Sequence, residues 1–121
     1  MEKQTYTYDE AFAKSLEYFK GDELAARVWV NKYAVKDSFG NIYEQSPEDM
    51  HWRIANEVAR IEAKYTNGLS AQELFDLLDH FKYIVPQGSP MTGIGNDFQV
   101  ASLSNCFVIG IDGTADSYGA I

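Results

Sequence analysis

The sequence contains little cysteine, proline or basic charge. Its one cysteine, Cys106, cannot form a disulfide within the chain, so no disulfide framework supports the fold. The chain has ten lysines and arginines and eighteen acidic residues, which gives a formal net charge of -8. A protein that binds the phosphate backbone of a nucleic acid needs the opposite balance. The composition therefore excludes a disulfide-rich scaffold and argues against a nucleic-acid partner.

Long apolar runs are also missing. No stretch approaches the roughly 20 apolar residues that span a membrane, and residues 1–6 are too polar for a signal peptide. The hydrophobic content of 45% and the charged content of 23% are typical of a globular protein. We expect one cytoplasmic domain, or a piece of one, without membrane contact.

Four helices are expected in the first two thirds of the chain, because apolar residues recur there at helical spacing behind polar capping residues. The expected helices cover residues 8–20, a segment after Asp22, a long segment from Pro47 to about residue 67, and a segment that must end before Pro86. The expected caps are Thr7, Asp22, Ser46 and Ser70. The second helix is expected to bury Leu24 and Val28, and the third is expected to bury a face from Met50 to Tyr65.

The composition changes after residue 85. Two prolines and three glycines fall within residues 86–96, which predicts an irregular loop without a helix. A strand is expected over residues 100–111, and it carries Cys106. Only residues 39–43 offer it a short partner, yet a strand needs neighbours for its backbone groups. We therefore expect a mainly α chain, with a helical segment over residues 1–85 and a loop and strand over residues 86–121, that belongs to a larger polypeptide or assembly.

Several separated blocks resemble a known family. Residues 83–91, 102–109 and 116–119, together with residues 21–29 and 46–51, look like the amino-terminal part of a class II ribonucleotide reductase, an adenosylcobalamin-dependent enzyme. The resemblance covers nearly the whole chain, with the blocks in the family's order and spacing. The class I catalytic subunit has a related loop and strand, but the Asn105–Cys106 pair and the short lead-in favour class II.

The resemblance implies a fold and a reaction. The family fold is a ten-stranded α/β barrel preceded by a helical segment, and this chain would supply that segment and the first strand. The family converts ribonucleotides to deoxyribonucleotides by thiyl-radical chemistry. Cys106 matches the cysteine that reduces the 2′ position of the substrate and then forms a disulfide with a second cysteine.

The same resemblance implies the ligand-binding residues. Ser89 matches the loop residue that helps to hold the substrate phosphate, and Ser104 and Asn105 flank the ribose pocket. Asp116 and Ser117 match the start of the region that binds a deoxynucleotide effector at a dimer interface. The implied partners are the polypeptide that carries the rest of the barrel, the ribonucleotide and the effector.

The chain departs from the family pattern because the other cysteines and the barrel's Asn and Glu are missing. We therefore expect no activity from this chain alone, and no adenosylcobalamin binding.

Plainer interpretations stand beside these. Without the resemblance, Cys106 is a small packing residue on a strand, residues 86–96 are a surface connection, and Asp116 and Ser117 are turn residues. His51 and His80 each lack the neighbouring ligands of a zinc site. The alternative function is a non-catalytic helical interaction module that docks, or forms a homo-oligomer, through its unpaired strand. A third hypothesis is a regulatory nucleotide-binding domain.

Overall fold

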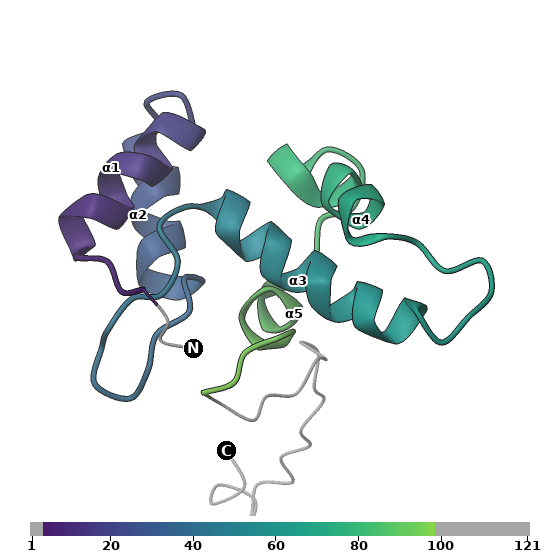
Figure 1. Ribbon diagram of the computed structural model, residues 1–121. Helices are drawn as coiled ribbons and strands as arrows, with labels where there is room; N and C mark the ends of the chain where they lie inside the picture. Colours follow the sequence, from purple (N-terminus) through teal and green to yellow (C-terminus); the bar gives the residue numbers. More distant parts are fainter. Residues whose placement is uncertain (1–3, 99–121) are drawn as a thin grey trace, which may run out of the picture.

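The computed structural model of the chain describes residues 4–98, and within them every regular element is a helix (Figure 1). This confirms the mainly α prediction. The elements are α1 (Tyr8–Tyr18), α2 (Glu23–Lys32), α3 (Pro47–Glu62), α4 (Ala71–Leu78), the 3₁₀ helix η1 (Asp79–Phe81) and α5 (Gly88–Gly93). The expected strand over residues 100–111 lies outside the described residues. None of the helices in this part of the chain is long and apolar enough to cross a membrane.

Three of the four predicted caps form as expected. Each capping side chain accepts a hydrogen bond from a backbone N–H of the first helical turn: Glu10 N to Thr7, Ala25 N to Asp22, and Glu73 N to Ser70. Ser70 and Glu73 complete a capping box. The helices α1, α2 and α4 therefore begin where the sequence predicts.

The start of α3 is built differently. Pro47 is its first residue, as predicted, but the side chain of Ser46 makes no capping hydrogen bond. Asp49 instead accepts a hydrogen bond from the N–H of Gln45 at 3.0 Å. The acidic side chain therefore holds the backbone one residue before the cap.

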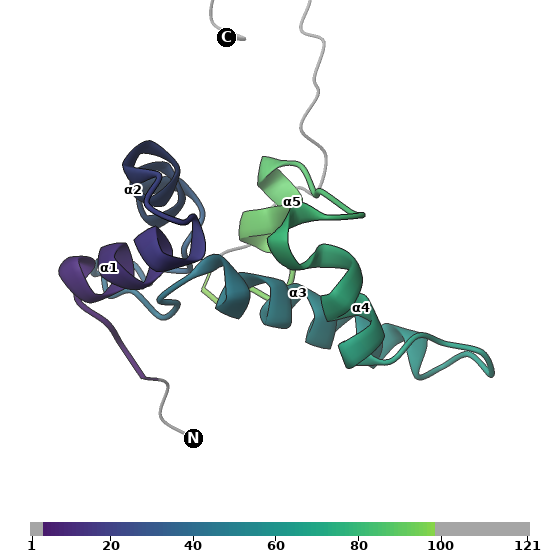
Figure 2. The same ribbon diagram turned by 90° about the horizontal axis from the view of Figure 1, so that it is seen from above.

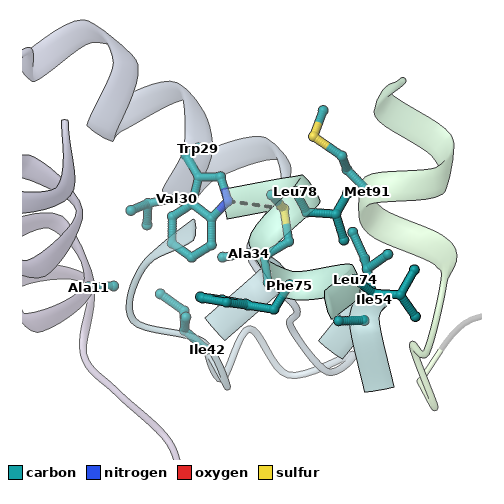
Figure 3. Close-up of a cluster of buried hydrophobic side chains, with 12 residues drawn as sticks. Ala11, Trp29, Val30, Ala34, Ile42, Ile54, Leu74, Phe75, Leu78 and Met91 are labelled. Atoms are coloured by element: carbon teal, nitrogen blue, oxygen red, sulfur yellow. Dashed lines mark hydrogen bonds between the residues drawn. The ribbon is translucent and has the colours of Figure 1, made fainter. Parts of the chain in front are cut away.

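The central element of the fold is α3, which contacts α1, α4 and η1. Figures 1 and 2 show α4 alongside it and α5 close to its middle. In the core, Trp29 of α2 donates its indole N–H to the sulfur of Met50 of α3 at 3.3 Å (Figure 3). The core cluster draws on all five α-helices: Ala11, Trp29, Val30, Ala34, Ile42, Met50, Ile54, Ala55, Leu74, Phe75, Leu78 and Met91.

The predicted buried face of α2 is wrong at Leu24 and Val28, which are 68% and 39% exposed. Trp29, a further candidate for that face, is buried, and so are Ala26 and Val30. Ala26 and Ala11 of α1 are both fully buried, which lets the packed backbones of α1 and α2 approach closely. The face of α3 is correct at Met50 and Ile54. Ile61 in its last turn is exposed, and so is Tyr65, which lies beyond the end of α3 at Glu62.

The prediction that no helix forms within residues 86–96 is also wrong, because this segment contains α5. Pro90 is the third residue of that helix, where a backbone N–H has no intrahelical acceptor, so proline is tolerated. Gly93 is its last residue. The hydroxyl of Thr92 donates toward the carbonyl oxygens of Gly88 at 3.2 Å and Ser89 at 3.3 Å, which ties the short helix together.

Candidate functional site

Ser89 is the second residue of α5, where its side chain is partly buried. The helix begins against the end of α2, since a Cβ built on Gly88 would lie 3.5 Å from Cε1 of Tyr33. Met91, two residues beyond Ser89, belongs to the core. The residue predicted to hold a substrate phosphate therefore lies on a segment packed onto the helical domain.

Arg53 of α3 connects this segment to the rest of the fold. Its Nη1 donates to the carbonyl oxygen of Ile94, its Nη2 donates to that of Met91, and its Nε donates to Glu44 Oε2 at 2.9 Å. The side chains of Arg53 and Glu44 are only 11% and 7% exposed. The guanidinium thus bonds the C-terminal end of α5 and a buried carboxylate at once.

Glu44 is itself held in place by the connection between α2 and α3. Its Oε1 accepts the N–H of Val35 at 3.1 Å, and Tyr43 N–H donates to Val35 O at 2.9 Å. Burial raises the pKa of Glu44, while Arg53 and the N–H of Val35 oppose that shift by favouring the carboxylate. The pKa of Glu44 stays raised overall, and the two side chains have the geometry of a hydrogen-bonded ion pair in a site that water hardly reaches.

Gly95 lets the chain pass close to α3. Its φ is +73°, a left-handed conformation that favours glycine, and a Cβ there would lie 2.9 Å from Cγ of Arg53. Beyond it, Asn96 Nδ2 donates to Thr92 O at 2.9 Å, and the ring of Phe98 stacks on Tyr43 at 4.7 Å. The described chain is thus held in place as far as residue 98.

A second cluster joins α1, α3 and η1. The hydroxyl of Tyr18 donates to Asp79 Oδ1 at 2.9 Å and accepts the N–H of His80 at 2.6 Å. The rings of Tyr18 and His80 stack with centroids 4.6 Å apart. Burial and the hydrogen bond to Asp79 raise the pKa of Tyr18.

His51 lies beneath this cluster and is fully buried. Its Nδ1 is 3.5 Å from Asp79 Oδ1, and neither ring nitrogen makes a hydrogen bond among the described residues. Burial lowers the pKa of His51, and the nearby carboxylate of Asp79 only partly offsets this. Within residues 4–98, no group of three or more His, Cys, Asp or Glu side chains is arranged to hold a metal ion.

An open apolar groove of about 360 Å³ lies between α2, η1 and α5. The exposed side chains of Leu24 and Val28 form one of its walls. Its other lining residues are Phe19, Asp22, Ala25, Trp29, Tyr33, Phe81 and Met91. The groove therefore adjoins the α5 segment that carries Ser89.

The resemblance gives Ser89 as a candidate, and its role stays a prediction, whereas Arg53 and Glu44 were not singled out from the sequence. Arg53 lies between the predicted core positions Met50 and Ile54, and a charged residue next to a buried helical face is the one signal that could have drawn attention to it. Cys106, Ser104, Asn105, Asp116 and Ser117 lie outside the described residues, so their roles stay predictions.

Residues 4–98 are thus all-α, and Arg53 of α3 bonds α5 and the residue after it to the other helices. The family model described as the ribonucleotide reductase, all-alpha domain, matches residues 19–93, more than half of the chain. The chain belongs to this family. The match includes Glu44, Arg53 and Ser89. Searches of curated proteins and of solved structures gave no match.

Proposed function

We propose that this chain supplies the helical N-terminal segment and the substrate-phosphate loop of an adenosylcobalamin-dependent ribonucleotide reductase. The observation that carries the proposal is the attachment of α5, with Ser89, to the matched all-alpha domain through Arg53. A loop that binds a phosphate must be held in one place if it is to orient a substrate.

The proposed chemistry is reduction at the 2′ carbon of a ribonucleotide. A hydrogen replaces the 2′-hydroxyl, water leaves, and two thiols supply two electrons and two protons as they join in a disulfide. Cys106 is one of these thiols. The second belongs to the remaining reductase polypeptide, because this chain has a single cysteine.

Adenosylcobalamin supplies the radical initiation when it is bound to the complete enzyme. We assign its binding to the remainder of the enzyme, as the resemblance implies.

The ligand contacts follow from the resemblance. Ser89 donates its hydroxyl to the substrate phosphate, and Ser104 and Asn105 border the ribose. Asp116 and Ser117 contribute to a deoxynucleotide effector site. The enzyme acts in the cytoplasm, where its thiols stay reduced.

Reconstitution tests this function. The chain is combined with a polypeptide that carries the rest of the barrel, and deoxyribonucleotide formation is measured with and without adenosylcobalamin. We expect activity only with both polypeptides and the cofactor, and none with Cys106→Ser, whereas Cys106→Ser would change little if the thiol only packed. Activity in the absence of adenosylcobalamin would contradict class II, and activity of Cys106→Ser would contradict the thiol's role.

A second candidate function is a non-catalytic interaction module, which the apolar groove lined by Leu24 and Val28 favours. This hypothesis predicts that the whole chain self-associates, that Leu24→Asp makes it monomeric in sedimentation experiments, and that no reading frame with further reductase cysteines follows. A monomeric chain that restores reductase activity would exclude it.

A further inference from the structure

We propose that Arg53 is a positioning residue for the α5 segment, which fixes the place from which Ser89 binds the substrate phosphate. The proposal rests on the proposed function, because the position of α5 affects the reaction only if Ser89 binds the substrate phosphate. Arg53 lies in α3, and its acceptors in and after α5 are 38 and 41 residues further along the chain.

The geometry of the guanidinium makes this contact directional. Its N–H donors lie in one plane in a fixed fork, so three acceptors bonded at once are fixed relative to one another. Here the three acceptors are Met91 O, Ile94 O and Glu44 Oε2. Two of them are the carbonyl groups where α5 ends, so the fork sets both the position and the direction of that helix.

The base of the fork is rigid. Arg53 lies between Met50 and Ile54, which are 0% and 3% exposed, and Glu44 is fixed by the N–H of Val35. A hydrogen bond screened from water is stronger than an exposed one and costs more to leave unmade. The α5 segment is thus attached to the core of the domain.

Arg53 acts on Ser89 through the backbone. The hydroxyl of Thr92 links the end of α5 to the carbonyl oxygens of Gly88 and Ser89, so a displacement at Met91 moves Ser89 with it. A lysine at position 53 would bring one compact ammonium that cannot serve the three acceptors in the same plane. We therefore expect Arg53→Lys to restore only part of the function that Arg53→Met loses.

Hydrogen exchange of the whole chain tests the attachment directly. The N–H groups of Met91, Ile94 and Asn96 donate to Gln87, Pro90 and Gly93, and their exchange reports opening of α5. We expect about tenfold faster exchange of these amides in Arg53→Met, because the segment loses its anchor. The matched control is Arg60→Met, since Arg60 lies on the same helix, is 63% exposed and bonds Glu57. Unchanged exchange at α5 in a folded Arg53→Met chain overturns the proposal.

Steady-state kinetics of the complete reductase test the consequence for the substrate. We expect Arg53→Met to raise KM by about tenfold or more, Arg53→Lys to raise it less, and Arg60→Met to leave it unchanged. A purely structural role would lower the amount of active enzyme at constant KM, and that result overturns the proposal. Ser89→Ala separates the proposed function from the positioning role of Arg53. If it raises KM while Arg53→Met does not, the proposed function stands and the role of Arg53 fails. If neither variant changes KM, both fail.

Discussion

At the scale of single residues, His51 makes the stability of the domain depend on pH. Burial lowers its pKa in the folded chain, whereas the unfolded chain titrates near pH 6.5. Asp79 opposes the shift, and His80 and Arg53 add to it. Since the unfolded state binds a proton more readily, the contribution of His51 to the free energy of unfolding is fully present above about pH 6.5. It falls as the pH drops toward the pKa of the folded state.

Urea unfolding between pH 8 and pH 5 measures this effect. Each unit of pKa difference corresponds to about 1.4 kcal/mol in the free energy of unfolding. We expect His51→Leu to remove the loss of stability that begins near pH 6.5. The matched comparison is His80→Asn, which should keep most of the loss, because His80 is exposed and is a lesser cause of the His51 shift than burial. Its φ of 56° suits asparagine. A loss below pH 6.5 that is the same in the wild type and in His51→Leu would exclude His51 as its source.

The buried pair of Arg53 and Glu44 gives a second prediction at this scale. Removing one partner of a buried pair leaves an uncompensated charge and costs about 3–5 kcal/mol. Arg53→Met should therefore be strongly destabilising. In Arg53→Met/Glu44→Gln the second change removes the stranded charge but keeps an acceptor for Val35 N–H, so we expect the double variant to be more stable than Arg53→Met. Urea midpoints compare the two, and equal midpoints would mean that Glu44 is already neutral once Arg53 is removed.

The contacts of Arg53 also show where prediction from sequence ends. Helical spacing identified Met50 and Ile54 on either side of it, since their burial is encoded in neighbouring residues. The acceptors of Arg53 lie 38 and 41 residues away, and they are backbone carbonyls that carry no side-chain signal. The sequence therefore predicts Ser89 through a motif but not the side chain that fixes its segment.

At the scale of elements, the starts of α1 to α4 were predictable, whereas α5 was not and the buried face of α2 was predictable only in part. Caps depend on residues three positions apart, so Thr7, Asp22 and Ser70 were readable directly. Leu24 and Val28 follow helical spacing, but they line the groove, while Ala26 is buried where α1 and α2 pack. The choice between two faces of α2 depends on its neighbours, which spacing alone does not encode.

The two serine caps give a matched prediction for the elements. Ser70→Ala should lower the free energy of unfolding by about 1 kcal/mol, because its hydroxyl accepts the N–H of Glu73 at 3.2 Å. Ser46→Ala at the start of α3 should cost less, because that side chain makes no capping bond. Chemical denaturation of both variants checks the order, and an equal or larger loss in Ser46→Ala would contradict it.

At the scale of the whole molecule, one core links all the helices. Ala11 of α1, Trp29 of α2, Ile54 of α3, Leu74 of α4 and Met91 of α5 belong to a single buried cluster (Figure 3). The connection between the α1–α2 pair and α3 includes the contact from Trp29 to Met50 and the hydrogen bond from Ser15 Oγ to Gln45 O at 3.1 Å. A shared core of this kind couples its elements, so we expect residues 4–98 to unfold as one unit.

The two tryptophans allow that coupling to be measured. Trp29 reports on the α1–α2 side, and Trp52, whose ring stacks on Phe75 at 4.0 Å, reports on the α3–α4 side. In Trp52→Phe the remaining tryptophan fluorescence comes from Trp29, and in Trp29→Phe it comes from Trp52. Within each variant, we expect the urea midpoint from fluorescence to match that from far-ultraviolet circular dichroism, because coincident probes mark a two-state transition. An earlier fluorescence midpoint for Trp29 alone would mean that α1 and α2 separate first, in which case the shared core does not bind the domain into one cooperative body.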